Sequence, residues 1–488
     1  MKEVHRHNGE AAGHRLKNVV VMKFGGTSVQ DAPAIRRLVQ IVRSRARFSR
    51  LVVVSALAKV TDQLISLGKL AAEEKLDVAT QSLAALCRRH EQLAFELLNK
   101  EDYLRVYSEL KNDFQVLGNL LSRIAENHQL SPQFQDHLAG FGECLSSRIV
   151  SAALRQANEN AALVDSRSCL VTDSCYTRAA PLWEQTQERV EMLLQPLLAE
   201  GKVPVLGGFI GADPDGIPTT LGRGGSDFSA TILGAALHAH RIEIWTDVDG
   251  VLTADPKLCP DARLIPRMSF GEASELAQCG AKVLHPSTLI PAMRENIPVF
   301  VLNSANPANR GTEIVSRANS GYGVRSVTLK RNVATVEIAT ETQVDPSLLE
   351  AVYSAFERHH GSLDWMECSR SSISLVVGST AGLPAIADDL RGVASMSWKN
   401  HQALVCLVGE NIRRRPDIVN GVFATVSDMD VRLACQSPSG RSIGLLVDES
   451  RAEESVQRLH SYFFPPCGDR EEPMSTCYAD ALVAGQLS

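Results

Sequence analysis

The 488-residue chain is predicted to form an α/β protein. Its mostly parallel sheet is covered by helices on both faces, and two smaller α+β modules follow it. Short β-branched runs alternate with helical segments over residues 18–314, which is typical of a parallel sheet. The composition becomes small and polar at 315–323 (VSRANSGYG), which predicts a linker. Strand–helix–strand patterns then recur at a spacing of roughly 70 residues within 324–465, which predicts two modules.

The first domain is expected to open with a buried strand, VVVMKF, that stops at Gly25-Gly26. A helix is predicted from about Ala32 to Arg47, and two or three helices are predicted within 62–130. Ligands of parallel α/β folds bind at the carboxyl ends of the strands, where the glycine motifs fall. Further strands are expected at 51–54, 162–165, 203–205, 242–245 and 299–302.

The C-terminal modules are predicted from two sets of elements, and the chain ends are expected to be loosely ordered. A polar leader at 1–17 lacks the apolar core of a signal peptide, and the tail at 466–488 is rich in Pro, Gly and charge. The first module is expected to contain a strand at 333–338, a helix at 346–359 and a strand at 373–377. The second is expected to contain a strand at 403–408, a helix at 416–427, a strand at 443–447 and a helix at 451–461.

Composition excludes several functional classes. The net charge of −6 and the absence of a basic block argue against nucleic acid as the main partner; the Arg413–Arg415 run is interpreted as a solvated turn. No apolar run approaches the length needed to span a bilayer, so no membrane partner and a cytoplasmic location are expected. The 11 cysteines show neither a CxxC pair nor metal-ligand spacing. They are expected to be reduced and mostly buried, with no metal site, and Cys144 is the strongest candidate for a reactive thiol.

The first glycine motif, KFGGTS, allows two interpretations. Gly25 and Gly26 follow a strand and precede a helix, so backbone N–H groups could approach an anion there. Lys23 could place a point charge on transferring phosphate oxygens. The motif is neither a Walker A loop nor G-x-G-x-x-G, and by itself it could be a simple tight turn.

The second glycine motif, GRGGSD, precedes a helical stretch predicted at 228–239. Capping of that helix would explain Ser226 and Asp227, but not three glycines around Arg223. A guanidinium held rigidly at a helix start is suited to a bidentate grip on a carboxylate. The two motifs together predict two anionic ligands brought face to face.

A third segment, WTDVDGVLTADPK, follows the strand at 242–245. Asp249-Gly250 is interpreted as a turn. Thr246, Asp247 and Lys257 are candidates for contacts to a nucleotide, and Lys282 in GAKVLHP is a weaker one because exposed helical lysines are common.

These motifs, together with GFGECLSS at 140–147, occur in the order and spacing typical of the aspartokinases. The chain resembles the monofunctional, lysine-sensitive bacterial type, from about Val19 to Thr312 and more weakly over 324–464. The resemblance implies an amino-acid-kinase fold followed by two ACT modules, one threaded into the other. It also implies ATP-dependent, Mg²⁺-assisted phosphorylation of L-aspartate to 4-phospho-L-aspartate, the first step toward lysine, threonine and methionine. A homodimer or dimer of dimers through the ACT modules is implied as well.

The resemblance assigns roles by position. Lys23, Gly25 and Gly26 match phosphate-binding elements, and Asp227 matches an organising acid beside Lys23. The remaining assignments concern the two substrates. Ser55 and Thr61 match substrate contacts, and Glu143 matches the residue that binds the aspartate ammonium group. Arg223 and Ser226 match the residues that bind the α-carboxylate of aspartate. The ATP-binding positions are matched by Thr246, Asp247, Lys257 and Lys282.

The chain departs from the family pattern in places. Leu252 stands where these enzymes often have Tyr, and Lys257 where they often have Arg, which bears on nucleotide affinity. Asp364 and Ser369 match effector-contacting positions. The effector loop at 339–349 lacks its Gly, however, and Arg370 replaces a Glu that would pair with a lysine ammonium. We therefore hypothesise that lysine inhibition is weakened or lost, and that the modules serve mainly as a dimer interface or sense another metabolite.

Two alternative functions are compatible with parts of this pattern. One is another amino-acid-kinase-fold enzyme that phosphorylates glutamate, carbamate or a nucleotide; Glu143 and the complete GRGGSD segment count against it. The other is a non-catalytic amino-acid sensor assembled through ACT modules. A sensor would not need Lys23, Glu143, Arg223 and Asp227, and all four are present.

Overall fold

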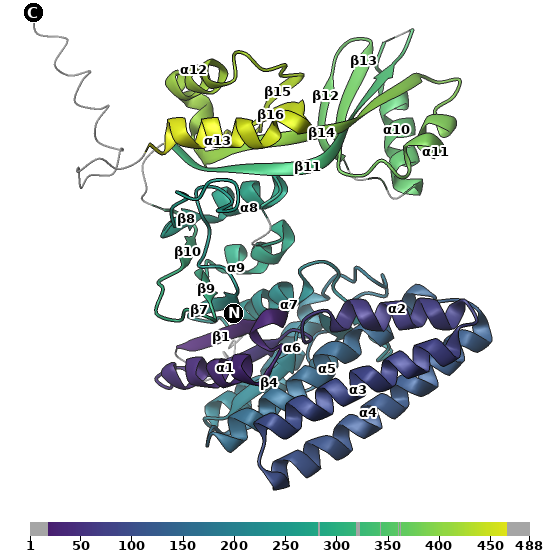
Figure 1. Cartoon of the computed structure of the whole chain (residues 1–488), viewed down its shortest axis with the longest axis vertical. Coiled ribbons are helices and arrows are strands. Elements are labelled where there is room, and N and C mark those ends of the chain that lie inside the picture. Colours follow the sequence, from purple (N-terminus) through teal and green to yellow (C-terminus); the bar gives the residue numbers. More distant parts are fainter. Residues whose placement is uncertain are drawn as a thin grey trace, which may run out of the picture. The chain divides into compact units, whose positions relative to one another are not determined.

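The structure is a computed structural model, and it describes residues 18–281, 284–318, 323–341, 343–359, 361 and 363–465 (Figure 1). The chain divides into two compact units. The first comprises Met1–Asp247 and Ile290–Arg310, and the second Val248–Leu289 and Gly311–Ser488. The predicted leader and tail lie outside the described residues, as do residues 319–322 of the predicted linker.

The first unit is built around parallel strands. β1 is central and pairs with β2 on one side and β7 on the other. β4 and then β3 continue the sheet beyond β2, and β9 continues it beyond β7. The predicted strands are thereby confirmed, with shifted ends. Their bounds are β1 Val19–Phe24, β2 Ser49–Val54, β3 Ala161–Leu163, β4 Val203–Gly207, β7 Arg241–Thr246 and β9 Val299–Asn303; a small hairpin follows β4, formed by β5 (Ile210–Ala212) and β6 (Pro218–Thr220).

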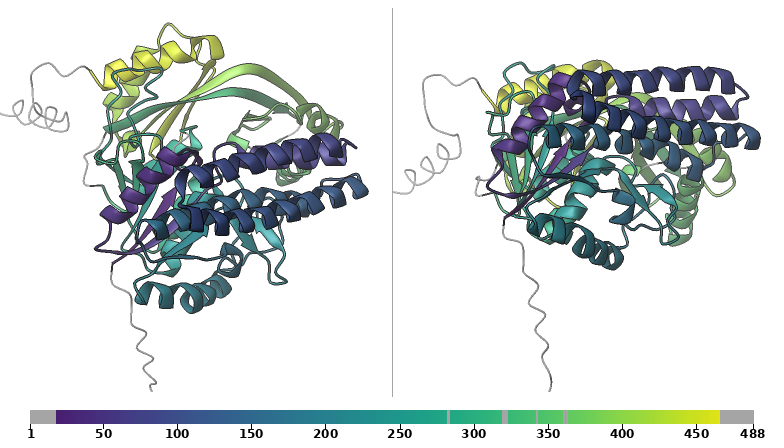
Figure 2. Two further views of the ribbon diagram at one scale, coloured as in Figure 1. Left: turned by 60° about the horizontal axis from the view of Figure 1, so that its bottom comes forward. Right: turned by 90° about the horizontal axis from the view of Figure 1, so that it is seen from below.

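Helices cover both faces of this sheet, as predicted. α1 and α5 pack on one face with α2–α4 outside them, while α6 and α7 pack on the other. Figure 2 shows α2, α3 and α4 running side by side, and they account for the helices predicted within 62–130. The bounds are α1 Ala32–Ser44, α2 Val60–Ala72, α3 Leu76–Leu97, α4 Lys100–Asn127, α5 Pro132–Gln156, α6 Trp183–Ala199, α7 Gly225–Ala236 and α9 Ile290–Arg294.

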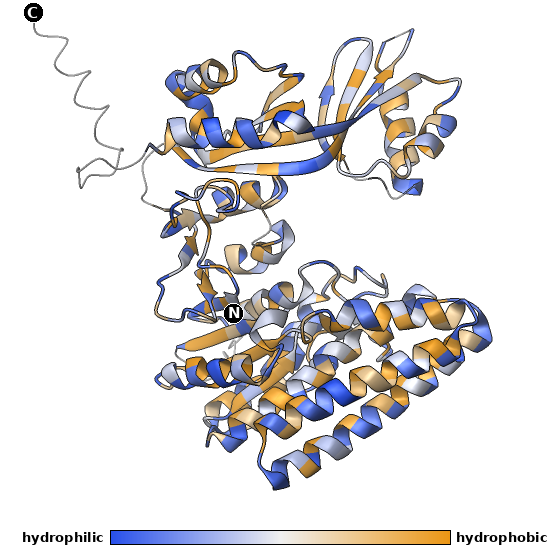
Figure 3. Ribbon diagram, in the orientation of Figure 1, coloured by the Kyte–Doolittle hydropathy of each residue, from blue (hydrophilic) through white to orange (hydrophobic). Residues whose placement is uncertain are grey.

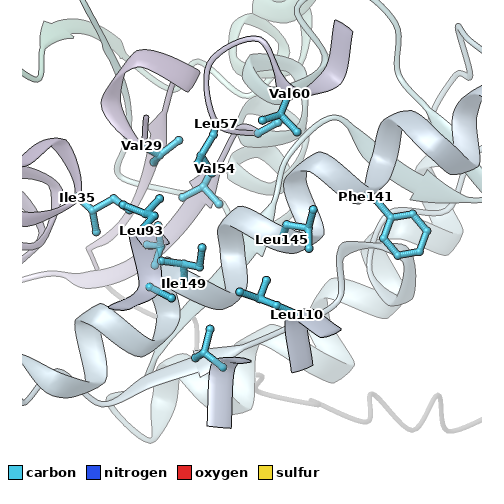
Figure 4. Close-up of a cluster of buried hydrophobic side chains, with 14 of the residues drawn as sticks. Val29, Ile35, Val54, Leu57, Val60, Leu93, Leu110, Phe141, Leu145 and Ile149 are labelled. Carbon is cyan, nitrogen blue, oxygen red and sulfur yellow. The ribbon is translucent and has the colours of Figure 1, made fainter. Parts of the chain in front are cut away.

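Successive side chains of a strand point to opposite faces of the sheet, and this decides which residues pack against which helices. Val20, Met22 and Phe24 belong to the cluster formed with α1–α5, whereas Val21 lies toward α7. Figure 4 shows part of that cluster, in which Val54 of β2 faces Ile149 of α5. In Figure 3 the central strands are mostly hydrophobic, while α3 and α4 carry both polar and apolar residues. Each fully buried aliphatic side chain contributes about 1.5–3 kcal/mol, so this core holds the strand ends firmly.

The second unit contains an antiparallel sheet in the order β12-β13-β11-β14-β16-β15. Its two long strands, β11 (Gly323–Ala339) and β14 (Ser395–Glu410), pair along most of their length. The sequence predicts only 333–338 and 403–408 within them. The unit also contains a parallel pair, β8 (Arg267–Ser269) and β10 (Thr312–Val315), and helix α8 at Phe270–Gln278. The other elements are β12 Leu363–Cys368, β13 Ser372–Val377, β15 Leu433–Gln436, β16 Ser442–Asp448, α10 Pro346–Arg358, α11 Leu383–Asp389, α12 Pro416–Thr425 and α13 Ala452–Phe463.

Two separate cores show that the modules of this unit are interleaved. One core combines the second half of β11 with α10, α11 and β13. The other combines Val327, in the first half of β11, with residues 403–459. It also takes in Ala254 and Cys259, so residues 248–289 group with this unit although they were predicted within an 18–314 domain. No helix of the described residues is both long and apolar enough to cross a membrane.

Candidate active site

A pocket of about 340 Å³ lies at the carboxyl ends of β1, β2 and β4. Its walls come from the residues after these three strands, from the middle of α5 and from the start of α7. This is the edge where parallel α/β folds bind ligands. The structure brings together seven of the predicted site residues here: Lys23, Gly26, Ser55, Thr61, Glu143, Ser226 and Asp227.

The Lys23 ammonium lies 2.6 Å from a carboxylate oxygen of Asp227, and both side chains are largely shielded from solvent. Asp227 is the third residue of α7. The predicted capping role of Ser226 and Asp227 is wrong, because the N-cap is Gly224 and no side chain caps the helix. Gly224 has φ +72°, a left-handed conformation that favours glycine. The loop thus turns sharply and presents the Asp227 carboxylate to Lys23.

The glycine pair after β1 lets two backbone segments approach each other closely, but it does not offer two free N–H groups. The Gly25 N–H donates to the Trp245 carbonyl at 3.0 Å, so it is already engaged. At Gly26 a Cβ would lie 3.0 Å from the Ala56 carbonyl oxygen, which leaves little room for a side chain. A short 3₁₀ turn follows at Gly26–Ser28, and the N-terminus of α7 lies at the pocket instead. The favourable end of a helix dipole therefore comes from α7.

Glu143 is a buried acid in the pocket wall, with 3% of its surface exposed. Burial raises its pKa to about 8, against the lowering effects of a backbone hydrogen bond from Ala56 and of the Lys23 charge. Its Oε2 atom has no hydrogen-bond partner among the described residues. Such a carboxyl is neutral near pH 7 in isolation and ionises when a cation binds beside it. The geometry suits recognition of an ammonium group.

Residues outside the pocket hold its walls in place. The Ser146 hydroxyl donates to the Ser55 carbonyl at 2.8 Å. Asp136, on α5, accepts hydrogen bonds from the N–H groups of Thr177 and Thr220, each at 2.8 Å, and from the Thr220 hydroxyl at 2.6 Å. Burial raises the Asp136 pKa, and these three bonds oppose that rise. The bonds fix the end of β6 two residues before Gly222.

Sequence reasoning missed six residues of the pocket wall: the apolar run 56–58 and the larger side chains of Lys59, Asp62 and Phe209. Phe209 has φ +67°, which is rare for a residue with a side chain, and its N–H donates to the Ser229 hydroxyl at 2.9 Å. The available signal for Phe209 was the Gly207-Gly208 pair that ends a buried strand. Asp136 and Ser146 gave no such signal, because they lie inside one continuous helix.

Other predicted site residues do not line this pocket. The Arg223 side chain is exposed, although Gly222 and Gly224 on either side of it line the wall. Thr246 ends β7, and its hydroxyl donates to Asp247 at 3.2 Å. Lys257 is exposed and belongs to the second unit, where its N–H donates to Asp255 at 2.9 Å. Lys282 lies outside the described residues.

The two predicted effector residues do not converge within one chain. The Asp364 carboxylate pairs with the Lys330 ammonium at 2.6 Å, near the start of β12. Ser369 follows the end of β12, with its hydroxyl 2.7 Å from that of Ser372. The two residues lie at opposite ends of β12, and each side chain is engaged by a different partner.

The cysteines are free thiols throughout the described residues. Burial raises the pKa of Cys144 to about 12, so its thiol stays protonated near pH 7 and is a poor nucleophile. Within the described part of the chain, no three His, Cys, Asp or Glu side chains are grouped to hold a metal ion.

The comparisons with known proteins cover nearly the whole chain. The model of the Amino acid kinase family matches residues 18–303, and that of an ACT domain matches 405–463. Lysine-sensitive aspartokinase 3 of Escherichia coli (strain K12) is 34% identical over 92% of this chain and 100% of its own length. Chloroplastic aspartokinase 3 of Arabidopsis thaliana is 34% identical over 96% of this chain and 85% of its own.

Solved structures agree with these matches. The crystal structure of E. coli aspartokinase III in complex with aspartate and ADP (R-state) has a TM-score of 0.82 at 33% identity, covering 92% of this chain and 100% of that one. The complex of the same enzyme with lysine and aspartate (T-state) has a TM-score of 0.76 at 34% identity, covering 91% of this chain and 99% of that one. The chain belongs to the aspartokinase family.

Proposed function

We propose that this protein transfers the γ-phosphoryl group of ATP to the side-chain carboxylate of L-aspartate, giving 4-phospho-L-aspartate. The observation that carries the proposal is the convergence of Lys23, Glu143 and Asp227 on one pocket at the strand ends. A similar chain, E. coli aspartokinase III, has been crystallised with aspartate and ADP. The same convergence argues against a non-catalytic sensor, which has no need of a shielded Lys–Asp pair beside a ligand pocket.

The chemistry needs neutralisation of charge more than proton transfer. The acceptor carboxylate has an ordinary pKa near 4 and is already ionised near pH 7, so no general base is required. Its difficulty is the approach of an anion to the ATP phosphates. Lys23 would neutralise charge on the transferring group, and Asp227 would orient Lys23. The N-terminus of α7 adds favourable backbone N–H groups.

Recognition of aspartate would use the remaining pocket residues. Glu143 would bind the α-ammonium group, because its buried carboxyl gains most by ionising beside a cation. Ser226, with Arg223 from the same loop, would bind the α-carboxylate, and Ser55 and Thr61 would complete the acceptor site. This division of roles predicts that substitutions of these aspartate-binding residues change mainly the KM for aspartate.

Nucleotide binding is proposed for the residues after β1 and β7 and for two lysines. Gly25, Gly26, Thr246 and Asp247 would approach ATP from the strand ends, and Lys257 and Lys282 would supply charge to its phosphates. Mg²⁺ would enter with the nucleotide, since this ion is usually held by substrate phosphates and water with one or two carboxylates. The described residues fit that mode because they include no dedicated metal cage, while Asp62 and Asp227 line the pocket.

The ACT modules are proposed to regulate the enzyme and to join subunits as a homodimer or a dimer of dimers. Lysine control is proposed to be weak for two reasons. Arg370 would repel a lysine ammonium, and the Asp364 carboxylate is already paired with Lys330. An incoming ammonium would therefore have to displace an existing ion pair. A different amino acid remains a candidate effector.

An acyl-phosphate assay tests the proposed function. Purified protein is incubated with ATP, Mg²⁺ and aspartate, and hydroxylamine traps the product as a coloured hydroxamate. We expect hydroxamate with aspartate and none above background with glutamate or carbamate as acceptor. Product with glutamate or carbamate alone would favour another enzyme of the fold. Failure of the protein to bind ATP would favour the sensor.

A further inference from the structure

We infer that Lys59 is a further substrate-binding residue, and that its ammonium group holds a carboxylate of the acceptor. The inference rests on the proposed function and extends it to a residue that neither the motifs nor the family resemblance assigns. Lys59 lies between β2 and α2 on the wall of the pocket. It is the N-cap residue of α2.

The backbone at Lys59 is in a conformation that disfavours a side chain. Its φ is +69° and its ψ is +1°, in the left-handed region where glycine carries no penalty and other residues do. The surrounding bonds fix this turn. The Lys59 carbonyl accepts from the Gln63 N–H at 3.1 Å, and Arg89 donates to the Ala58 carbonyl at 3.1 Å.

Those backbone bonds would be equally well made by glycine, since none of them uses the lysine side chain. The structure therefore maintains a strained lysine where a glycine would serve the fold better. Strain of this kind in non-glycine residues clusters at ligand sites, where the side chain has a task that offsets it. The observed outlier points to a role for the ammonium group.

The charges around the pocket indicate what that role is. Among the charged residues of the wall, Lys23 is paired with Asp227, and Glu143 holds a proton near pH 7. Lys59 has no ion-pair partner among the described residues, even though Asp62 lies three residues further on. Its ammonium is thus a cation of the wall that is available to an anionic ligand.

Position along the chain favours the acceptor over the nucleotide. Lys59 lies four residues after Ser55 and two before Thr61, the two residues of this segment proposed to contact aspartate. The reactive carboxylate and the α-carboxylate give aspartate two negative groups against one ammonium. An exposed lysine at the mouth of the acceptor site can capture such a ligand and hold it by a charge-assisted hydrogen bond.

Three substitutions separate the charge from the backbone strain. Lys59→Ala removes the charge and keeps the strain, Lys59→Gly removes both, and Lys59→Arg keeps both. We expect the KM for aspartate to rise about tenfold in the Ala and Gly variants and to change little in the Arg variant, since one charge-assisted bond is lost. The KM for ATP should stay within about twofold of the wild-type value. The Gly variant should also melt at a higher temperature than the Ala variant.

Lys69→Ala is the matched control, because Lys69 is an exposed lysine of the same helix that does not line the pocket. A wild-type KM for aspartate in Lys59→Gly would overturn the inference and leave the position as a turn. An equal rise in the KM values for ATP and aspartate would overturn the assignment to the acceptor. Calorimetric titration of aspartate into each variant reports binding even if the wild type makes no hydroxamate, so the proposed function and the Lys59 inference fail separately.

Discussion

Two segments that were predicted as ligand loops of one domain differ in the contacts that fix their position. The GRGGSD loop at 222–227 is fixed within the first unit by Asp136 and by the Lys23–Asp227 pair. The segment at 248–265, which carries Lys257, is fixed within the second unit. There the Thr253 carbonyl accepts from the Val327 N–H at 2.8 Å, and the Thr253 hydroxyl lies 2.9 Å from Nε2 of His460.

The second segment also shares a hydrophobic core with the regulatory modules. Ala254 and Cys259 pack in one cluster with Val456 and Leu459 of α13. Close-packed interiors transmit small displacements, so a change in this core reaches the Lys257 segment without passing through the parallel sheet. If Lys257 binds the nucleotide as proposed, acceptor chemistry and nucleotide affinity depend on different cores. Substitutions in each core should therefore affect different kinetic constants.

The largest effect is expected from Lys23→Ala. Loss of the cation proposed to neutralise the transferring phosphoryl group should lower kcat about a thousandfold, while the melting temperature changes little. Rapid-quench measurement of phosphoryl transfer checks this, with the exposed Lys75→Ala as the control. Turnover within tenfold of the wild-type value would show that Lys23 is not at the chemical step.

Glu143→Gln should raise the KM for aspartate about a hundredfold, because a neutral amide cannot pair with the ammonium. In the wild type the carboxyl must ionise on binding, so the KM should fall as the pH rises toward about 8, the value to which burial raises the Glu143 pKa. Binding below that pH should release a proton. Calorimetry in two buffers of different ionisation enthalpy measures this release, which Glu143→Gln should abolish.

The same raised pKa gives a stability prediction. The folded chain holds a proton on Glu143 that the unfolded chain, with the ordinary pKa of 4.5, releases at lower pH. This contribution is fully present below about pH 4.5 and is lost as the pH rises through about 8. Glu143→Gln should therefore flatten that part of the curve of unfolding free energy against pH. Parallel curves for the two proteins would contradict a raised pKa.

Asp136→Ala should weaken the wall that supports the GRGGSD loop. Its removal leaves three donors of Thr177 and Thr220 without their acceptor and should cost about 3 kcal/mol or more of stability. The KM for aspartate should rise about tenfold, with a smaller change for ATP. Urea unfolding and steady-state kinetics measure the two effects. Asp136→Asn, which retains one acceptor oxygen, should lie between the wild type and Asp136→Ala.

His460→Ala and Thr253→Val should act on the other segment. Each removes the Thr253–His460 hydrogen bond between α13 and the Lys257 segment and should raise the KM for ATP about threefold to tenfold, leaving the KM for aspartate unchanged. Val352→Ala, in the separate core with α10, is the control for general destabilisation of the unit. If that control raises the KM for ATP equally, the comparison between the two segments fails.

The smallest effect is expected from lysine itself. At about 1 mM, lysine should inhibit the wild-type enzyme less than about twofold, because Lys330 and Arg370 oppose a second ammonium near β12. Initial rates with lysine, threonine and methionine test this. Full inhibition at sub-millimolar lysine would show that the effector displaces the Lys330–Asp364 pair readily.

Much of the architecture was predictable because its signals are local. The run VVVMKF, the glycines that end it and the periodicity of 62–130 depend on neighbouring residues, and they correspond to β1, its turn and α2–α4. The long strands β11 and β14 were predicted only in part, because the unpredicted half of each strand is more exposed and pairs with the predicted half of the other strand, far away in sequence. The capping role assigned to Ser226 and Asp227 was wrong because Lys23, more than two hundred residues away, takes the carboxylate.

The sequence by itself determined the fold class, the two glycine motifs and the identity of most pocket residues, because β-propensity, glycine turns and motif order are properties of short stretches of chain. Tertiary structure alone decided three further points. Burial sets the pKa of Glu143, the turn before α2 places Lys59 on the wall of the pocket, and a shared core attaches the Lys257 segment to the regulatory modules. Each depends on contacts between residues distant in sequence or on the final path of the backbone, and no local pattern records those.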